Sequence, residues 1–286
     1  MSDRLIGVVI VYNPDKKLIS NIGSYLTDLD QLIVIDNSDS NHDFTTLGFQ
    51  SNKIRLIQKP ENIGIASALN IAAKIALQQG YNWMLTMDQD SAFLPGTFAV
   101  YAAIPQTIHH SEKIAIIGPE IYAEDEISPS PPSQVQLEDA DLIITSGSII
   151  SLAIWKEIGG FEDKLFIDEV DHDYCLKALS NKYVIKAAKG IYLAHNLGKS
   201  LFISKKGVVQ RKVLHPPKRL YYIVRNGIYL MNKYSDDFPK ICKSRRKILY
   251  ITVKNNLLYG SDRFLQLKFI IMGVWHYLIG KYGKQT

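Results

Sequence analysis

Short runs of branched apolar residues recur through the first 90 residues, with polar turns and longer helical repeats between them. Residues 5–11, 31–35, 54–58 and 83–87 form such runs, and the first of them, LIGVVIV, has no alternation of apolar and polar positions. A run without alternation is typical of a strand that is buried on both faces. The pattern therefore predicts four buried strands at the centre of a sheet.

Helical repeats fill the intervals between these strands. Leu18, Ile22 and Leu26 recur at helical spacing within residues 17–29, and residues 63–79 form a longer, Ala-rich segment of the same kind. Strands that alternate with helices predict an α/β fold with a parallel sheet and right-handed crossovers. Ligands of such open sheets bind beyond the carboxyl ends of the strands. The polar residues at those ends are Asn13, Asp36, Asn37, Asp88 and Asp90.

Strand and helix patterns continue beyond residue 90, and past His195 the pattern becomes mainly helical, with basic loops. We therefore expect two parts, an α/β domain over residues 1–200 and a mainly helical extension over residues 201–286. The further elements expected within the α/β domain are strands at residues 114–117, 149–152, 183–187 and 191–193, helices at residues 96–109, 155–159 and 171–180, and a polar surface loop at residues 124–139.

Charge is divided unevenly between these two parts. The chain carries 33 Lys plus Arg and 28 Asp plus Glu, a formal net charge of +5. Residues 1–198 hold 14 basic and 25 acidic side chains, whereas residues 199–286 hold 19 basic and 3 acidic ones. Opposite charge in the two parts indicates two tasks, one of which meets an anionic surface.

The composition is that of an ordinary globular protein. With 286 residues, of which 47% are apolar and 21% charged, the chain can bury a core, and wholesale disorder is excluded. The two cysteines, Cys175 and Cys242, make neither a disulfide framework nor a zinc site, which fits a reducing compartment. The N-terminus lacks signal-peptide features, and the longest uncharged apolar run, residues 269–280, is too short to span a bilayer. We expect a cytoplasmic protein.

Asp88-Gln89-Asp90 follows directly on the fourth strand. Two carboxylates two residues apart at a strand end can turn towards one point and hold a hard divalent cation, which in turn binds phosphate oxygens. An acidic pair in a solvated turn is the plainer alternative. His195, also at a strand end, would complete a mixed oxygen and nitrogen ligand set that suits Mg²⁺ or Mn²⁺. A purely structural histidine is the alternative there.

A second acidic cluster, Asp168, Glu169, Asp171 and Asp173, stands at the start of an expected helix. Capping of that helix and interaction with its dipole are sufficient reasons for acidic residues at this place. Four carboxylates within six residues exceed what one cap needs, however, and a carboxylate near a cation-bound phosphate can act as a general base.

The segment Asn62-Ile63-Gly64-Ile65-Ala66 precedes the Ala-rich helix. Small residues at this point allow the backbone to approach a ligand closely. Capping of the helix by Asn62 is the alternative.

Six of these motifs occur in an order that points to a known family. The motifs are Tyr12-Asn13 and Asp36-Asn37 after strands, Asn62 to Ala66, Asp88-Gln89-Asp90, the Gly159-Gly160-Phe161 turn, and the second acidic cluster, with His195 after them. Over about residues 4–200 this order resembles that of the family 2 inverting glycosyltransferases of GT-A fold. Met87 to Ser91 and Tyr221-Tyr222-x-x-Arg225-Asn226 are most similar to the bacterial rhamnosyltransferase branch. The resemblance implies a mostly parallel, Rossmann-like sheet flanked by helices, with a basic helical C-terminal extension.

The resemblance also implies roles for individual residues. Asp171 takes the position of the catalytic base, and many members have Glu before it where this chain has Val170. Asp168 is a candidate substitute for that Glu as an acceptor contact. Gly147 and Gly160-Phe161 would shape the acceptor pocket. The implied metal ligands, for Mg²⁺ or Mn²⁺, are Asp88, Asp90 and His195, and the implied nucleotide contacts are Val11, Tyr12, Asn13, Asp36, Asn62, Gly64, Asp88 and, near the phosphates, Arg225. A solvated basic position is the alternative for Arg225.

The implied function is metal-dependent, inverting transfer of a sugar from a nucleotide-sugar donor. The resemblance favours L-rhamnose from dTDP-rhamnose, with a lipid-linked glycan of surface polysaccharide as acceptor. The leaving diphosphate then needs a cation, and the acceptor hydroxyl needs a base to take its proton. A hexosyltransferase that uses a UDP-sugar is the nearest alternative. A nucleotidyltransferase would need a Gly-rich first loop, which residues 11–14 lack, and a non-catalytic scaffold would leave the polar strand ends unexplained.

The C-terminal extension is basic and has apolar faces at helical spacing. Residues 240–286 carry ten basic side chains and one acidic side chain, Asp262. An amphipathic element on an anionic membrane fits this pattern, with the protein peripheral on the inner face of the cell membrane. Helices that pack on the first domain or form a homodimer are the alternative. Nucleic acid is a poorer partner, because no nucleic-acid motif occurs among these residues.

Overall fold

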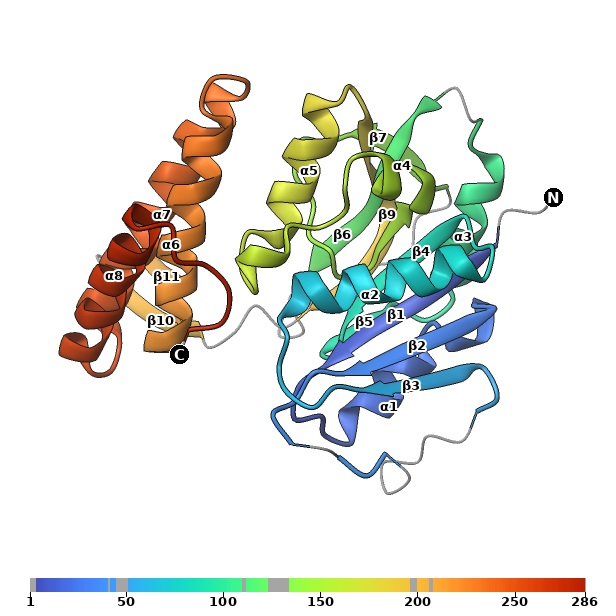
Figure 1. The fold of residues 1–286 in the computed structure, drawn as a ribbon, viewed down its shortest axis with the longest axis horizontal. Coiled ribbons are helices and arrows are strands. Elements are labelled where there is room, and N and C mark those ends of the chain that lie inside the picture. Colours follow the sequence, from blue (N-terminus) through green and yellow to red (C-terminus); the bar gives the residue numbers. More distant parts are fainter. Residues whose placement is uncertain are drawn as a thin grey trace. The chain divides into compact units, whose positions relative to one another are not determined.

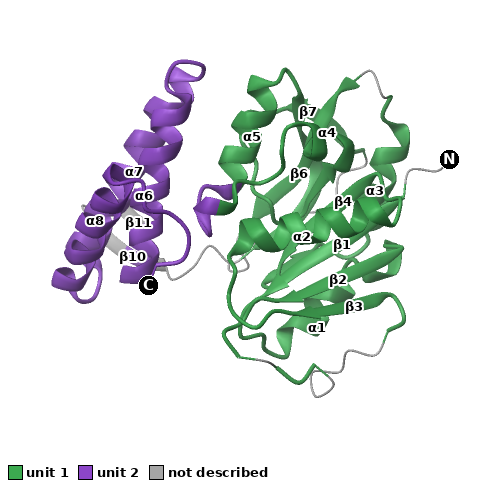
Figure 2. Cartoon of the chain, viewed as in Figure 1, with its two compact units in different colours: residues 1–163, 171–196 green, residues 164–170, 197–286 purple. Residues whose placement is uncertain are grey.

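The computed structural model describes residues 4–40, 42–44, 51–109, 112–122, 134–195, 200–205 and 208–285. It divides into two compact units (Figure 2). Unit 1 consists of residues 1–163 and 171–196, and unit 2 of residues 164–170 and 197–286. Seven residues from the middle of the chain therefore pack with the C-terminal part, directly before Asp171.

Nine strands of the described chain form one mixed sheet in unit 1 (Figure 1). Their order is β3-β2-β1-β4-β8-β6-β9-β5, and β7 pairs with β9. The strands are β1 (Leu5–Val11), β2 (Gln31–Asp36), β3 (Ile54–Gln58), β4 (Trp83–Asp88), β5 (Ser91–Phe93), β6 (Ile114–Tyr122), β7 (Gln136–Asp139), β8 (Ser148–Ser151) and β9 (Val184–His195).

Helices cover both faces of the parallel part of this sheet. All seven residues of β1 are buried, as the unbroken apolar run predicts. Leu18 and Ile22 of α1 and Phe98 and Tyr101 of α3 pack into the main core cluster on one face, and α2 crosses the opposite face (Figure 1). Burial of each such large side chain contributes roughly 1.5–3 kcal/mol. The helices of unit 1 are α1 (Lys17–Gly23), α2 (Ile65–Gln78), α3 (Phe98–Ala103), α4 (Leu152–Glu157) and α5 (Val170–Ser180).

Strand directions bring several chain ends to one edge of the sheet. β1 is parallel to β2 and β4, and β8 lies antiparallel between β4 and β6. β6 therefore runs in the same direction as β4, and β9 is parallel to β6. The carboxyl ends of β1, β2, β4, β6 and β9 consequently meet at the same edge, which positions the site.

The structure corrects several expected elements. β3 is an edge strand rather than a buried one, because β2 is its only pairing partner in the part of the chain that the structure describes, and its Leu56 is exposed. The helix expected over residues 17–29 ends at Gly23, and the two strands expected over residues 183–193 form one strand, β9. Of the expected loop 124–139, residues 136–139 form β7 and residues 124–133 lie outside the described part.

Unit 2 contains three helices and a hairpin among its described residues. The helices are α6 (Pro217–Tyr234), α7 (Pro239–Tyr259) and α8 (Arg263–Leu278), and the antiparallel hairpin is β10 (Ser200–Lys205) with β11 (Val208–Val213). The hairpin departs from the mainly helical pattern expected here. Gly273 allows α8 to approach α6 closely, since a Cβ there would lie 2.7 Å from the carbonyl oxygen of Tyr221. Within the described residues, no helix combines the length and the apolar character needed to cross a bilayer.

Candidate active site

The loop after β1 is joined to the ends of β2 and β4 by hydrogen bonds. The N–H of Asn37 donates to the carbonyl of Val11 at 2.8 Å, and the N–H of Asn13 donates to Ser38 Oγ at 2.8 Å. Asn13 adopts a φ of 47°, in the left-handed region that Asn tolerates better than most residues. The half-exposed Tyr12 donates its hydroxyl to Asp39 Oδ2 at 3.2 Å. Val11, Tyr12 and Asn13 thus lead into a loop that these hydrogen bonds hold at the carboxyl edge of the sheet.

Asp36, the last residue of β2, is almost fully buried. Its Oδ1 accepts the N–H of Ser38 at 3.1 Å, and its Oδ2 lies 3.5 Å from His42 Nδ1. This Oδ2 is enclosed and has no hydrogen-bond partner among the described residues. A buried carboxylate oxygen without such a partner is costly, so it suits a hydrogen-bond donor on a ligand.

The segment before α2 forms a turn that is tied to the end of β2. Asn62 Oδ1 accepts the N–H of Gly64 at 2.9 Å, and Asn37 Oδ1 accepts the N–H of Ile63 at 2.8 Å. Gly64, at a φ of 85°, is the residue at the helix N-cap, and no side chain caps the helix there. Asn62 therefore shapes the turn and does not cap α2, which corrects the alternative considered for it.

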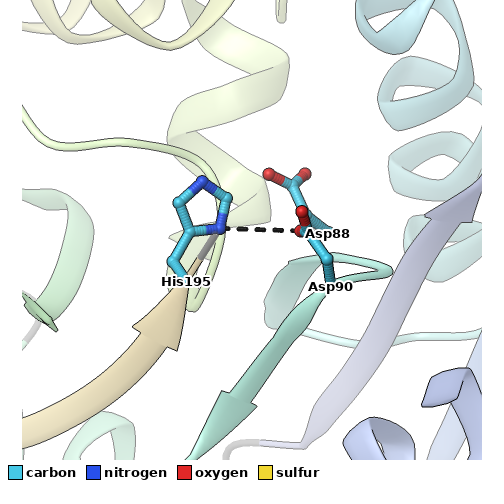
Figure 3. Close-up of side chains that lie close together, drawn as sticks. All are labelled: Asp88, Asp90 and His195. Atoms are coloured by element: carbon cyan, nitrogen blue, oxygen red, sulfur yellow. Dashed lines mark ion pairs between the residues drawn. The ribbon is translucent and has the colours of Figure 1, made fainter. Parts of the chain in front are cut away.

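Asp88, Asp90 and His195 converge from three different parts of the sheet (Figure 3). Asp88 ends β4, Asp90 lies in the turn before β5, and His195 ends β9. One ligand atom from each lies within 4.8 Å of the others, and His195 Nδ1 is 3.7 Å from Asp90 Oδ1. Two carboxylates and an imidazole are a donor set that fits a divalent cation such as Mg²⁺ or Mn²⁺.

Comparison with known proteins shows what the chain is similar to. The family model described as "Glycosyl transferase family 2" matches residues 8–126, which include the last four residues of β1, all of β2 and the Asp88-to-Asp90 turn. The chain carries a family 2 glycosyltransferase domain. The dTDP-rhamnosyl transferase RfbF of Shigella flexneri is 24% identical over 283 residues, which cover 92% of this chain and 90% of RfbF.

Two solved structures share the fold of this glycosyltransferase. GalNAc-T7 with UDP, GalNAc and Mn²⁺ has a TM-score of 0.58 at 12% identity, and the alignment covers 97% of this chain but 56% of that one. TarS of S. aureus with UDP-GlcNAc has a TM-score of 0.56 at 14% identity, with 96% and 80% covered. The GT-A fold expected from the sequence is therefore confirmed, and so is glycosyltransferase activity.

The second acidic cluster is divided between the two units of the glycosyltransferase. In unit 1, Asp171 stands in the first turn of α5, where its Oδ1 accepts the N–H of His172 at 2.8 Å. The Asp171 side chain is partly exposed. Asp173 is fully buried, 3.8 Å from Lys177 Nζ. Burial of the neighbouring Cys175, with Asp171 and Asp173 close by, raises the pKa of that thiol to about 12. Of these two aspartates, Asp171 is the one that solvent reaches.

A cavity of about 210 Å³ adjoins the start of α5. It is lined by His172, by Gly118, Pro119 and Ile121, and by residues 142–144. The loop that continues from residue 144 reaches β4, where the N–H of Gly147 donates to the Thr86 carbonyl at 2.7 Å. Gly147 has a φ of 77°, and a Cβ there would lie 2.8 Å from Leu193. This loop therefore lies between the cavity beside His172 and the end of β4.

The buried side chain of Asn70, on α2, makes several hydrogen bonds to the Gly160-Phe161 turn, and Lys177 Nζ donates to the Gly160 carbonyl at 2.7 Å. Asn70 Oδ1 accepts from the Phe161 N–H at 2.9 Å and from Trp155 Nε1 at 3.2 Å, and its Nδ2 donates to the Phe161 carbonyl at 2.9 Å. Asn70 is the one buried polar residue of the Ala-rich helix α2. A buried polar side chain of this kind needs hydrogen-bond partners, and this is the sequence signal for a residue that binds a neighbouring turn. The sequence motifs alone assign no role to Asn70.

Arg225, in unit 2, is completely buried, which corrects the solvated position considered as its alternative. Its guanidinium donates to Asn226 Oδ1, Tyr221 Oη and the carbonyls of Gly283 and Leu165 at 2.9–3.2 Å. The rings of Tyr221, Tyr222 and Tyr282 lie 5.0–5.4 Å from it. A contact between Arg225 and phosphates stays a prediction, and it would require this network to open.

Asp168 also belongs to unit 2 and forms an ion pair with Arg219 at 3.2 Å. Asn226 Nδ2 donates to the backbone carbonyls of Leu165, Ile167 and Asp168 at 2.6–3.1 Å. The segment that precedes Asp171 in the chain is thus fastened by side chains of α6. Its proposed acceptor contact through Asp168 stays a prediction.

Proposed function

We propose that this glycosyltransferase moves L-rhamnose from dTDP-rhamnose to a lipid-linked glycan, with inversion at the transferred sugar. The observation that carries the proposal is the convergence of Asp88, Asp90 and His195 at the carboxyl edge of the sheet. The printed name of RfbF, a dTDP-rhamnosyl transferase similar over 92% of the chain, supports the choice of donor.

Asp88, Asp90 and His195 would hold Mg²⁺ or Mn²⁺, and the Mn²⁺ in the GalNAc-T7 structure supports a divalent cation. When bound, the cation supplies positive charge that stabilises the leaving diphosphate. Asp36 Oδ2, which lacks a hydrogen-bond partner among the described residues, would accept from the base or ribose. Val11, Tyr12, Asn13, Asn62, Gly64 and Asp88 would lie along the nucleotide, and Arg225 near its phosphates.

Asp171 would act as the general base. It is partly exposed, directly precedes His172, which lines the cavity, and would accept the proton of the acceptor hydroxyl as that oxygen attacks the anomeric carbon. A single displacement from the side opposite the diphosphate inverts the anomeric configuration. The cavity lined by His172 and by residues 142–144 would receive part of the acceptor.

We assign the membrane surface to unit 2, and in particular to an apolar face of α8. Phe264, Leu267, Ile271, Trp275 and Leu278 recur at helical spacing and are 45–89% exposed. Lys243, Arg246, Lys247 and Lys254 of α7 are also exposed, and Asp262 is the only acid between residues 240 and 286. An anionic bilayer satisfies both the apolar face and the cations. A two-fold homodimer through the same face would oppose like charges.

This assignment gives the two parts of the chain different tasks. Residues 1–200 would bind the donor and carry out transfer, and residues 201–286 would serve the acceptor side and hold the protein peripherally on the inner, cytoplasmic face of the cell membrane. Surface polysaccharide synthesis is the process that fits a lipid-linked acceptor at that place.

A thermal-shift screen of nucleotide sugars, with and without Mn²⁺, tests the proposed donor. We expect dTDP-rhamnose with Mn²⁺ to stabilise the protein most, by about 2.7 kcal/mol at a concentration of about 100 Kd. Asp90→Asn should lose the Mn²⁺-dependent part of the shift. Stabilisation by a UDP-sugar instead would indicate another hexosyltransferase, and stabilisation by nucleoside triphosphates alone a nucleotidyltransferase.

A further inference from the structure

Two buried serines connect Asp88 to His195. The backbone N–H of Asp88 donates to Ser146 Oγ at 3.2 Å, Ser146 Oγ donates to Ser91 Oγ at 2.8 Å, and Ser91 Oγ lies 2.7 Å from His195 Nδ1. Ser91 is 0% and Ser146 1% exposed. An unbroken line of hydrogen bonds therefore runs behind the proposed cation site, from one ligand to another.

The direction of this line is set at its first bond. A backbone N–H only donates, so Ser146 Oγ accepts there, and its own hydroxyl proton is donated to Ser91 Oγ. Ser91 keeps its hydroxyl proton for His195 Nδ1, and it can also accept if Nδ1 carries a proton. The bond between Ser91 and Nδ1 therefore persists in either state of the imidazole.

The ring of His195 has two nitrogens, and Figure 3 shows the ring edge that carries both of them turned toward Asp88 and Asp90. Ser91 engages Nδ1 at hydrogen-bond distance, whereas Nδ1 to Asp90 Oδ1 is 3.7 Å. Histidines that bind metals commonly place one nitrogen on the metal and the other in a hydrogen bond that fixes the ring. Here Ser91 makes the hydrogen bond that fixes the ring.

We propose that Ser91, oriented by Ser146, is a positioning residue that holds Nδ1 of His195 and leaves Nε2 as the nitrogen that meets the cation or its diphosphate. This inference rests on the proposed function of the same site. It adds two residues to that site, neither of which touches the ligand. Ser91 follows Asp90 directly in the chain. The acidic turn therefore carries one proposed cation ligand, Asp90, next to the residue that positions another, His195.

Mn²⁺ affinity, measured by electron paramagnetic resonance in the presence of dTDP, tests the role of the serines. We expect Ser91→Ala and Ser146→Ala each to weaken Mn²⁺ binding by about 10- to 100-fold, and Ser91→Thr, which keeps the hydroxyl, to retain most of it. Ser148→Ala is the matched control, because Ser148, at the start of β8, is equally buried but donates to the Ile144 carbonyl. Unchanged affinity in both alanine variants would overturn the proposal. Tighter binding by Ser91→Ala would also overturn it, since Nδ1 would then be the ligand.

The wild-type protein can show directly which ring nitrogen of His195 meets the cation or its diphosphate. This experiment remains possible if an alanine variant does not fold. ¹⁵N chemical shifts of the His195 ring, assigned with His195→Gln, are recorded before and after addition of Mg²⁺ and dTDP. The larger change is expected at Nε2, and a larger change at Nδ1 would contradict the proposal. If the wild-type protein binds neither Mn²⁺ nor any nucleotide, the proposed function itself fails. If it binds both and the variants or shifts contradict the role of Ser91, only the present inference fails.

Discussion

Gln89 binds the backbone of Tyr12 through both ends of its amide. The N–H of Tyr12 donates to Gln89 Oε1 at 2.7 Å, and Gln89 Nε2 donates to the carbonyl of Tyr12 at 3.1 Å. The residue between the two proposed acidic ligands thus holds the loop that follows β1. One side chain couples the proposed nucleotide contacts to the proposed cation site.

Replacement of Gln89 should therefore weaken donor binding although Gln89 itself need not touch the donor. We expect Gln89→Ala to raise the Kd for dTDP with Mg²⁺ about tenfold, since it removes two hydrogen bonds of roughly 0.5–1.5 kcal/mol each. Isothermal titration calorimetry measures the change. Gln78→Ala, at an exposed position of α2, is the control. An unaltered Kd in Gln89→Ala would show that the loop is held by its other contacts.

Asp171→Asn should separate catalysis from donor binding. An amide cannot take the proton of the acceptor hydroxyl, so we expect transfer to slow by about 10²–10⁴-fold while the Kd of the donor changes little. Single-turnover transfer assays and donor titration give the two quantities. Glu157→Gln, at the end of α4, should behave as wild type. Turnover at the wild-type rate would remove Asp171 from the role of base.

Arg225→Lys should destabilise unit 2. Lysine lacks the planar fork that reaches Asn226, Tyr221 and two backbone carbonyls together, so acceptors remain unsatisfied in a buried place. We expect the free energy of unfolding to fall by about 2–3 kcal/mol, measured by urea denaturation. Arg211→Lys, on β11 at a partly exposed position, is the control. Unchanged stability together with weaker donor binding would instead place Arg225 on the phosphates.

The stability of unit 2 should depend on pH through His215. Burial, with Arg219 close by, lowers the pKa of His215 to about 4, whereas an unfolded histidine titrates near 6.5. The unfolded chain therefore binds the extra proton first, and stability is lost as the pH falls from about 6.5 towards 4. His215→Gln should flatten this part of the curve of unfolding free energy against pH. His109→Gln, an exposed histidine of unit 1, should leave it unaltered.

A charge placed on the apolar face of α8 should abolish membrane binding. Ile271 lies in the middle of that face and is 59% exposed, so Ile271→Glu should prevent burial of the face without disturbing the core. Sedimentation with vesicles that contain anionic lipid measures binding, and added salt should weaken it for the wild type. Val100→Glu, an exposed apolar position on α3, is the control. Binding that depends on neither salt nor anionic lipid would favour a homodimer.

The sequence was informative wherever a feature is local. The unbroken apolar run of residues 5–11 predicts a strand buried on both faces, and β1 is such a strand. Asp88 and Asp90 follow a strand of the same kind, so their place at the carboxyl edge could be inferred from order alone. These strands and their polar ends depend on residues that are neighbours in the chain, so the pattern of apolar and polar positions predicts them directly.

Only the tertiary structure decided which distant residues share a site. His195 comes within 3.7 Å of Asp90 because β9 pairs with β5, and Ser146 reaches Asp88 because β8 inserts between β4 and β6. The bond between Ser91 and Ser146, and the bonds from Arg225 to the carbonyls of Leu165 and Gly283, cannot be inferred from periodicity, since the partners lie 55 to 60 residues apart in the chain. The polar strand ends and the order of motifs could thus be predicted from the sequence. The hydrogen bonds that orient them arise from long-range pairing and are visible only once the chain is folded.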